Sequence, residues 1–364
     1  MRIDGGDVAG IRWWAPDEAP LRLSGFAWYE QDRALRRLPK SSSGAVPEAV
    51  DALAEATTGG QVSLRTDARR LLVAARMAGP ARMDHMPPTG QSGFDCYIGE
   101  PGALTHAGVA RFEPDRTDYV ATVLDLPEAE PDRVREVVVN FPLYQGVQEV
   151  AIGIPEDAQV AAPTPYVRPG QIILYGTSVT QGGCASRPGM VHSNILGRAL
   201  QMPVVNLGFS GNGRGEPEVA EVIATAPDPA LFILDYEGNS GGAEALARTL
   251  PEFIAILRAA HPDVPILVLT RVRYAREGAF ATITERRLAC RAVAREVVTS
   301  LQAQGDEQLH LFECGDLIPE AVVDECSVDG AHLTDLGFWF MADGLLPVVR
   351  ALVAGSDQSP TEIR

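Results

Sequence analysis

Hydrophobic positions in the second half of the chain form short, nearly continuous apolar runs that alternate with amphipathic helical patterns. Such runs are typical of strands buried on both faces of a parallel sheet. We expect strands at Ile172–Tyr175, Val204–Leu207, Leu231–Tyr236, Pro265–Thr270 and Leu309–Glu313. We expect helices at Met190–Leu200, Glu216–Thr225, Ala243–Ala260, Phe280–Gln304 and Thr334–Val353. This alternation predicts an α/β fold with a five-stranded parallel sheet, whose carboxyl-end loops meet at one edge.

The first half has a different pattern, of short segments in which apolar and polar residues alternate. These segments are Ile11–Ala15, Leu21–Tyr29, Gln61–Arg65, Arg70–Ala74, Phe94–Ile98, Tyr119–Leu124, Glu136–Asn140 and Gln148–Ile154. Many short strands at this spacing predict an antiparallel β-sandwich. The helical period occurs here only at Pro47–Glu55. A sandwich beside an enzyme is often a carbohydrate-binding or oligomerisation module, or simply a packing domain.

A stretch rich in proline separates the two patterns, and its lack of periodicity predicts a linker at residues 162–170. We therefore expect a jelly-roll-like accessory domain over residues 1–161 and a catalytic domain over residues 171–364. With 364 residues, the chain is long enough for two cores.

Composition and charge exclude several functions. No run of about 18 apolar residues occurs, so no membrane span is expected. The polar start Met1–Val8 lacks the apolar segment of a secretory signal, so none is expected. The net charge of −17 repels nucleic-acid phosphates and anionic lipid surfaces. The five cysteines are odd in number and scattered, which disfavours a disulfide framework and a zinc site and favours a reducing cytoplasm. We expect no bound metal.

Polar residues that suit acyl-transfer chemistry follow several of the predicted strands. Ser178 follows the first strand, and its hydroxyl can attack a carbonyl once a base takes the proton. His332 is the candidate base, and Asp329, three residues earlier, can hold the imidazole in the required tautomer. The backbone N–H groups of Ser178 and Gly211 and the amide of Asn239 can form an oxyanion hole.

Each of these residues also has a commoner structural role. Ser178 can cap a helix, and Gly211 and Asn239 can form turns. Residues Gly211–Gly215 also resemble part of a dinucleotide fingerprint, but Glu216 stands at its third glycine position and would repel a pyrophosphate. However, four loops at the same edge of the sheet each carry a residue type that acyl transfer requires. This coincidence favours the acyl-transfer interpretation.

A second set of residues is expected near the substrate. The loop Asp84–Tyr97 combines prolines and glycines with unusual polar residues, and we expect it to reach toward the edge of the parallel sheet. Structural roles, including salt bridges for the arginines, are the alternative for each member of the set. The candidate pocket residues are His85, Met86, Asp95, Thr177, Arg187 and Arg214.

The residues quoted above resemble the sequence blocks of the SGNH, or GDSL-type, hydrolase family. Gly176-Thr177-Ser178 corresponds to the serine block, and Thr177 and Val179 depart from the usual Gly-Asp-Ser-Leu. Gly211 corresponds to the glycine block, Asn239 to the asparagine block, and Asp329 with His332 to the last block. Ser240 follows Asn239 at a position where aspartate is usual in the family. Gly93–Tyr97 is similar to the Gly-x-Asp-Leu-Tyr signature of the N-terminal domain in one subgroup, and Gly182–Met190 is similar to that subgroup's sequence after the serine. The resemblance implies a flavodoxin-like SGNH domain after the sandwich.

The resemblance and the residues leave three functions open. The first is an O-acyltransferase that moves an acyl group, for instance an aryl group from a CoA thioester, through acyl-Ser178 onto a hydroxyl of a natural product or sugar. The second is an esterase that hydrolyses small acyl esters of carbohydrates. The third is a non-catalytic protein that binds carbohydrate. The expected partners are a small acyl donor and a hydroxyl acceptor, with acyl-CoA as a co-substrate and no permanently bound cofactor, in a chain that can form a homo-oligomer.

Overall fold

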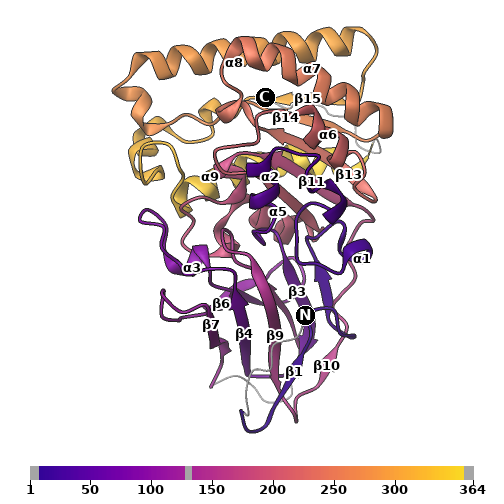
Figure 1. The fold of residues 1–364 in the computed structure, drawn as a ribbon, viewed down its shortest axis with the longest axis vertical. Coiled ribbons are helices and arrows are strands. Elements are labelled where there is room, and N and C mark those ends of the chain that lie inside the picture. The colour runs from indigo at the N-terminus through magenta and orange to yellow at the C-terminus, as the bar shows by residue number, and fades with distance from the viewer. Residues whose placement is uncertain (1–7, 128–132, 356–364) are drawn as a thin grey trace.

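The computed structural model describes residues 8–127 and 133–355, and Figure 1 shows a β-rich part below an α/β part. Residues 1–7, on which the prediction about a secretory signal partly depends, lie outside the described residues.

Two antiparallel sheets form the β-rich part, as the sequence predicted. One sheet has the strand order β1-β9-β4-β7, and the other has the order β10-β3-β8-β5-β6 with β2 paired to β3. Their strands are β1 (Ile11–Trp14), β2 (Arg22–Ser24), β3 (Gln61–Thr66), β4 (Arg70–Met77), β5 (Asp95–Gly99), β6 (Thr105–Val109), β7 (Asp118–Asp125), β8 (Arg135–Asn140), β9 (Val147–Pro155) and β10 (Val160–Ala161). A buried apolar cluster fills the space between the sheets, with Leu64, Val73, Val139 and Ile152 among its members.

Some predicted elements of this part were wrong in detail. The segment Leu21–Tyr29 was predicted as one strand, but it contains only the three residues of β2 before a turn and the helix α1 (Tyr29–Asp32). The strand β6 was not predicted, because Thr105–Val109 lacks a clear apolar alternation. Two further short helices are α2 (Glu48–Leu53), which was expected, and α3 (Pro88–Gln91), which was not.

The α/β part contains the predicted five-stranded parallel sheet. Its strands are β11 (Gln171–Gly176), β12 (Val204–Gly208), β13 (Pro229–Asp235), β14 (Ile266–Leu269) and β15 (Leu309–Phe312). They lie in the order β12-β11-β13-β14-β15, and every pairing is parallel. This is the flavodoxin-like order, in which the first strand of the sheet lies beside both the second and the third. The order in which strands are added therefore reverses at β11.

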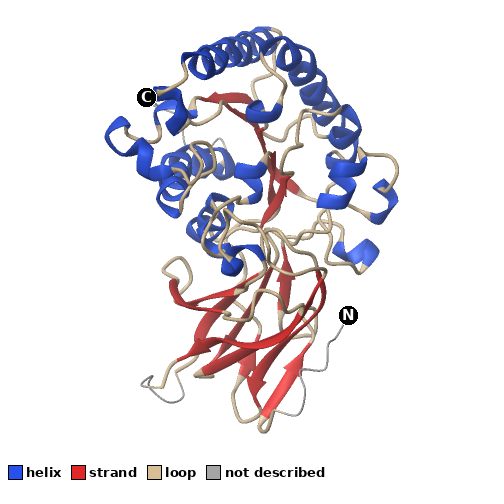
Figure 2. Ribbon diagram, turned by 60° about the vertical axis from the view of Figure 1, so that its left-hand side comes forward, coloured by secondary structure: helices blue, strands red, loops and turns tan. Residues whose placement is uncertain are grey.

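Helices cover both faces of this sheet (Figure 2). On one face, α6 (Pro217–Ile223), α7 (Ala243–Ala260) and α8 (Ala281–Ala303) pack on side chains such as Tyr175 and Phe232. On the other face, α5 (His192–Leu200) and α9 (Asp335–Ala354) pack on side chains such as Leu174 and Ile233. Alternate residues of each strand therefore enter two different cores, which explains the continuous apolar runs.

The helix α9 is long and apolar enough to cross a membrane by length and composition alone. In the folded chain, however, Phe338, Met341, Leu345 and Val349 on one side of α9 are buried in the core of the α/β part. A core helix of a globular protein meets the same criterion, and α9 packs in the core in this way.

The two parts also share a core. Trp28, Leu38, Val46, Val50 and Ala54, from the first 60 residues, pack with α6 and α7 on the parallel sheet. The buried guanidinium of Arg37 donates hydrogen bonds to the carbonyl oxygens of Asn206 at 3.3 Å and of Gly208. Burial lowers the pKa of Arg37 to about 9. A segment of the predicted first domain therefore packs onto the second domain.

The predicted linker at residues 162–170 is held by hydrogen bonds to both parts. The backbone N–H of Thr164 donates to Glu136 of the sandwich at 3.1 Å, and the hydroxyl of Tyr166 donates to Ser24 at 3.0 Å. The backbone N–H of Val167 donates to the carbonyl of Gln201, just before β12, at 3.3 Å. These contacts fix the sandwich against the α/β part.

Candidate active site

The predicted site residues are brought together at the carboxyl end of β11. Gly176, the last residue of β11, pairs with Gly208 of β12 on one side and with Asp235 of β13 on the other. The loops after three adjacent strands thus begin around a single residue. Open α/β sheets bind ligands at this kind of edge, where the strand order reverses.

Ser178 begins the short helix α4 (Ser178–Gln181), directly after β11. Thr177 caps this helix, because its hydroxyl accepts a hydrogen bond from the backbone N–H of Val179 at 3.3 Å. The hydroxyl of Thr180 in turn accepts from the backbone N–H of Thr177 at 3.1 Å. This reciprocal capping fixes the turn that carries Ser178. Thr177, predicted as a pocket residue, is therefore a helix cap.

His332 lies beside Ser178. Its Nε2 is 2.9 Å from Ser178 Oγ, and its Nδ1 is 2.6 Å from Asp329 Oδ2. The other oxygen of Asp329 accepts hydrogen bonds from the backbone N–H groups of His332 at 2.8 Å and of Ala331 at 3.0 Å. Burial acts to raise the pKa of Asp329, but these backbone and side-chain hydrogen bonds outweigh it and lower the pKa to about 2. Asp329 is therefore ionised at neutral pH and oriented toward the imidazole.

Backbone hydrogen bonds hold the loop that carries Asp329 and His332. This loop lies between the 3-10 helix η6 (Glu320–Cys326) and α9. The backbone N–H of Val328 donates to the carbonyl of His332 at 2.9 Å, and that of Thr334 donates to Cys326 at 3.0 Å. Arg276, in the 3-10 helix η4 (Ala275–Gly278) after β14, donates its backbone N–H to the carbonyl of Gly330 at 3.2 Å. The loop of the Asp-His pair is therefore supported by a second segment.

Gly211 and Asn239, the other predicted oxyanion donors, follow β12 and β13. Gly211 has a φ of +68°, which favours glycine there. Gly213 packs so close to the carbonyl oxygen of Gly176 that an added Cβ would lie 2.1 Å from it. The amide of Asn239 donates a hydrogen bond to the backbone carbonyl of Asn212. These contacts place Gly211 in the loop after β12 and Asn239 at the end of the 3-10 helix η3 (Glu237–Asn239), both beside the end of β11. The side-chain amide of Asn239 has a second N–H that can donate to a ligand.

A buried carboxyl group lies beneath the turn of Ser178. Asp235 Oδ2 accepts a hydrogen bond from the hydroxyl of Thr180 at 2.8 Å, and both side chains are buried. Burial raises the pKa of Asp235 to about 7, although the hydrogen bond from Thr180 acts in the opposite direction. The sequence placed Asp235 in the predicted strand Leu231–Tyr236 but gave it no role at the site, because its burial and the Thr180 contact depend on the folded chain.

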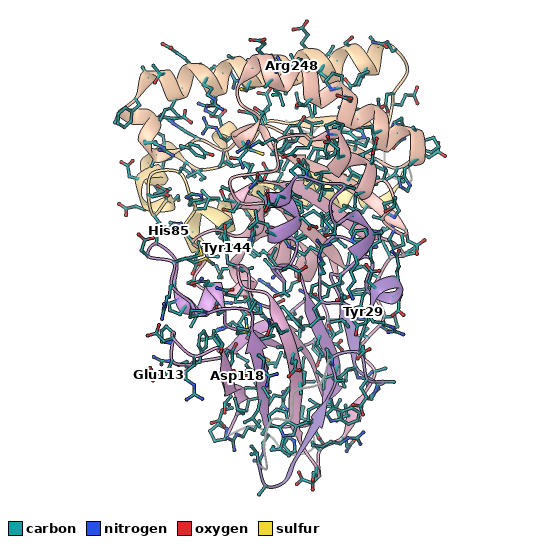
Figure 3. All side chains as sticks on the ribbon, viewed as in Figure 1. Tyr29, His85, Glu113, Asp118, Tyr144 and Arg248 are labelled. Carbon is teal, nitrogen blue, oxygen red and sulfur yellow. The ribbon has the colours of Figure 1, made fainter. Side chains whose placement is uncertain are left out.

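The first half of the chain contributes side chains to the site, as the pattern at Asp84–Tyr97 predicted. The ring of His85 lies 5.8 Å from the ring of His332, measured between centroids, and Met86 is buried in the α/β core. Tyr144 donates its hydroxyl to the carbonyl of Ser178 at 3.4 Å. Figure 3 shows His85 and Tyr144 on the same side of the molecule, where the two parts meet. No pattern in the sequence distinguished Tyr144.

The structure gives Asp95 and Arg187 a different place from the predicted substrate pocket. Asp95 is fully buried, and its carboxylate binds the guanidinium of Arg187 at 2.8 Å and the backbone N–H of Gly189 at 2.8 Å. Asn140 donates to the other oxygen at 2.7 Å. These contacts connect the sandwich to the loop after α4, so both residues have structural roles. Arg214, also predicted for the pocket, is exposed and donates to the carbonyl of Gly211 at 2.9 Å.

Comparisons with known families agree with this geometry. Residues 170–350 match the model of the GDSL-like lipase/acylhydrolase family, and residues 11–160 match the model described as the N-terminus of SGNH hydrolase-type esterases, named for its GxDLY motif.

The chain belongs to the GDSL-like lipase/acylhydrolase family.

Solved structures share this two-part architecture with the GDSL-like chain. A protein described as a GDSL-like lipase from Bacteroides ovatus is 27% identical, with a TM-score of 0.84, over 94% of this chain and 98% of that one. The salicylyl-acyltransferase SsfX3 from a tetracycline biosynthetic pathway is 20% identical, with a TM-score of 0.76, over 96% and 99%. A family two carbohydrate esterase from Cellvibrio japonicus is 14% identical, with a TM-score of 0.59, over 94% and 98%. The last two likenesses show a common fold. No curated protein is significantly similar in sequence.

Proposed function

We propose that the protein is a serine-dependent O-acyltransferase that works through an acyl-Ser178 intermediate. The observation that carries this proposal is the 2.9 Å contact between Ser178 Oγ and His332 Nε2, together with the 2.6 Å contact between His332 Nδ1 and Asp329. A hydroxyl, an imidazole and an ionised carboxylate in this order form the arrangement that activates serine nucleophiles.

The reaction follows from this geometry. As Ser178 Oγ attacks the acyl carbonyl, its proton passes to His332 Nε2, and Asp329 stabilises the imidazolium that forms. The N–H groups of Ser178 and Gly211 and the amide of Asn239 donate to the oxyanion of the tetrahedral intermediate. His332 then gives its proton to the leaving group, and the acyl-serine remains. In the second half, His332 takes the proton of the acceptor hydroxyl, whose oxygen attacks the acyl-serine and releases Ser178.

Transfer rather than hydrolysis is supported by the surroundings of Ser178. Ser178 is buried, and His85 and Tyr144 from the first half of the chain lie beside His332 and Ser178. Side chains in these positions can contact an acceptor and limit the access of water, and a bound acceptor gains several kcal/mol of proximity over one from solution. The salicylyl-acyltransferase with the same fold, at 20% identity, makes an aryl acyl donor such as a CoA thioester the first candidate to test.

Ester hydrolysis is the second candidate, because the base remains open to solvent. The side chain of His332 is 27% exposed and that of Asp329 is 40% exposed, so water can reach the imidazole. The acyl-serine intermediate is the same in both reactions, and small acyl esters of carbohydrates are the corresponding substrates. The family match favours either enzyme over a non-catalytic carbohydrate-binding protein.

Product analysis separates the two reactions. The enzyme is incubated with aryl-CoA thioesters and with aryl esters, in the presence or absence of a panel of sugar and polyphenol hydroxyl acceptors, and products are separated by liquid chromatography with mass detection. Transfer predicts an acylated acceptor in excess of free acid at millimolar acceptor. Free acid as the sole product with every acceptor would establish hydrolysis instead. Ser178→Ala serves as the control for uncatalysed acyl migration.

A further inference from the structure

Three potential metal ligands meet at the catalytic edge. One ring nitrogen each of His85 and His332 and the Sγ atom of Cys184 all lie within 4.8 Å of one another. The three residues come from separate segments: a loop of the first half, the loop after α4, and the loop before α9. Two imidazoles and a thiolate are ligands that zinc and other thiophilic divalent cations prefer.

The orientation of both histidines suits a metal ligand. Nδ1 of His85 is 3.1 Å from Asp84 Oδ1, and Nδ1 of His332 is 2.6 Å from Asp329 Oδ2. Histidines that bind metals usually direct the ring nitrogen opposite the metal at a carboxylate or carbonyl group, which fixes the tautomer and raises the basicity of the ligating nitrogen. Each histidine here has a carboxylate partner at Nδ1, which leaves Nε2 as the nitrogen for a cation, and in His332 this is also the atom 2.9 Å from Ser178 Oγ.

The cluster is slightly more open than a closed metal site. Ligand distances of about 2.0–2.3 Å place the ligand atoms of a tetrahedral zinc roughly 3.3–3.8 Å apart, so a shift of about 1 Å would close the cluster. Cys184 is buried, whereas the side chain of His85 is 36% exposed, so the movable ligand is the one that faces solvent. A cation can therefore enter from the solvent side, and the net charge of −17 attracts cations.

We infer that His85, Cys184 and His332 bind a thiophilic divalent cation such as Zn²⁺, and that the bound ion inhibits the enzyme by occupying His332 Nε2. Binding replaces waters of the cation with two neutral imidazoles and a thiolate, and the thiol proton of Cys184 passes to solvent. Ser178 then has no base, because the electron pair that would accept its proton is shared with the metal. The inhibitory step rests on the proposed function, whereas ligation does not.

Cobalt provides a direct readout of ligation. The full-length enzyme is titrated with Co²⁺, the visible spectrum reports tetrahedral geometry, and the near-ultraviolet thiolate-to-cobalt band reports coordination by Cys184. The same titration is made with Cys184→Ala and His85→Gln, and with the matched controls Cys290→Ala in α8 and His106→Gln in β6. Circular dichroism of each variant checks folding.

We expect a thiolate band in the parent enzyme and no such band in Cys184→Ala. Both site variants should bind Co²⁺ with an affinity lower by about 10-fold or more, and both controls should bind it with the affinity of the parent. Zn²⁺ should inhibit the parent, and a chelator should restore activity. Because binding releases a proton, the affinity should rise with pH. A parent enzyme without the thiolate band, or a Cys184→Ala variant with unchanged affinity, would overturn the inference. Ligation without inhibition would leave the metal site intact and count against the catalytic role of His332.

Discussion

Ser178 Oγ lies 2.9 Å from His332 Nε2, although 154 residues separate them in the sequence. The short distance depends on Gly176, which pairs with strands on both sides, and on the hydrogen bonds that hold the loop before α9. Neither side chain needs to move for the proton to pass. An enzyme with this arrangement is organised for acyl chemistry before substrate binds.

Removal of Asp329 should reduce turnover less than removal of Ser178 or His332. Asp329→Ala leaves the nucleophile and the oxyanion donors in place but releases the imidazole from its orientation. We expect a fall in kcat of about 10³- to 10⁴-fold, measured with an aryl ester. Asp324→Ala, at an exposed carboxylate in the same segment, is the matched control and should retain activity. Equal activity in the two variants would remove Asp329 from the mechanism.

The amide of Asn239 should contribute mainly to the transition state. Asn239→Ala removes one proposed oxyanion donor, so kcat should fall about 10²- to 10³-fold while KM changes little. Steady-state kinetics measure both constants. Asn212→Ala is the control in the adjacent loop, because it removes a side chain that donates to the carbonyl of Ser210 at 3.1 Å and keeps the backbone carbonyl that Asn239 binds. A rise in KM at unchanged kcat would assign Asn239 to ground-state binding.

The buried carboxyl of Asp235 should make stability depend on pH. Its pKa in the folded chain is about 7, against 3.8 for an ordinary aspartate. Between those values the folded chain holds a proton that the unfolded chain has lost, so stability falls as pH rises from about 4 to 7 and then levels off. At 1.36 kcal/mol per pKa unit, the loss is at most about 4 kcal/mol.

Asp235→Asn tests this dependence, because a neutral amide resembles the protonated carboxyl. The variant should lose less stability than the parent between pH 5 and pH 8, measured as melting temperature. Asp324→Asn, at an exposed position, should follow the parent. Identical pH slopes in the parent and in Asp235→Asn would show that Asp235 has an ordinary pKa.

The ion pair of Arg187 and Asp95 should contribute to stability rather than to substrate binding. Arg187→Met leaves the fully buried carboxylate of Asp95 without its cation, and loss of one partner of a buried pair typically costs about 3–5 kcal/mol. Urea denaturation measures this cost, and Asp95→Asn combined with Arg187→Met should recover part of it. Arg82→Met breaks an exposed pair with Asp115 of similar length, 2.9 Å, and should change stability little. A large rise in KM without loss of stability would return Arg187 to the substrate pocket.

Much of the fold was predictable because local patterns determine it. The five parallel strands and the helices between them follow from continuous apolar runs and amphipathic periods, and each was located within a few residues. The position of Ser178 follows from the same patterns, because it comes directly after a buried strand. Thr105–Val109 was missed because none of its residues is buried and its sequence lacks an apolar alternation.

Contacts between distant segments were beyond sequence reasoning. Trp28 and Val50 lie in the first half but pack on the parallel sheet, and their apolar character alone does not show which core they enter. Asp95 and Arg187 were predicted near the substrate because charged residues in glycine-rich loops often face ligands, but here they neutralise each other in the interior. The approach of Cys184 to two histidines depends on the meeting of three loops.

The most direct test of the account is the intact mass of the enzyme after rapid mixing with an aryl ester or acyl-CoA donor. We expect a transient mass increase equal to one acyl group on the peptide that contains Ser178, and we expect this adduct to decay faster when a hydroxyl acceptor is added. Ser178→Ala should fold normally, form no adduct and lose about 10⁴-fold or more in turnover. An adduct on another residue, or near-normal turnover in Ser178→Ala, would contradict the account.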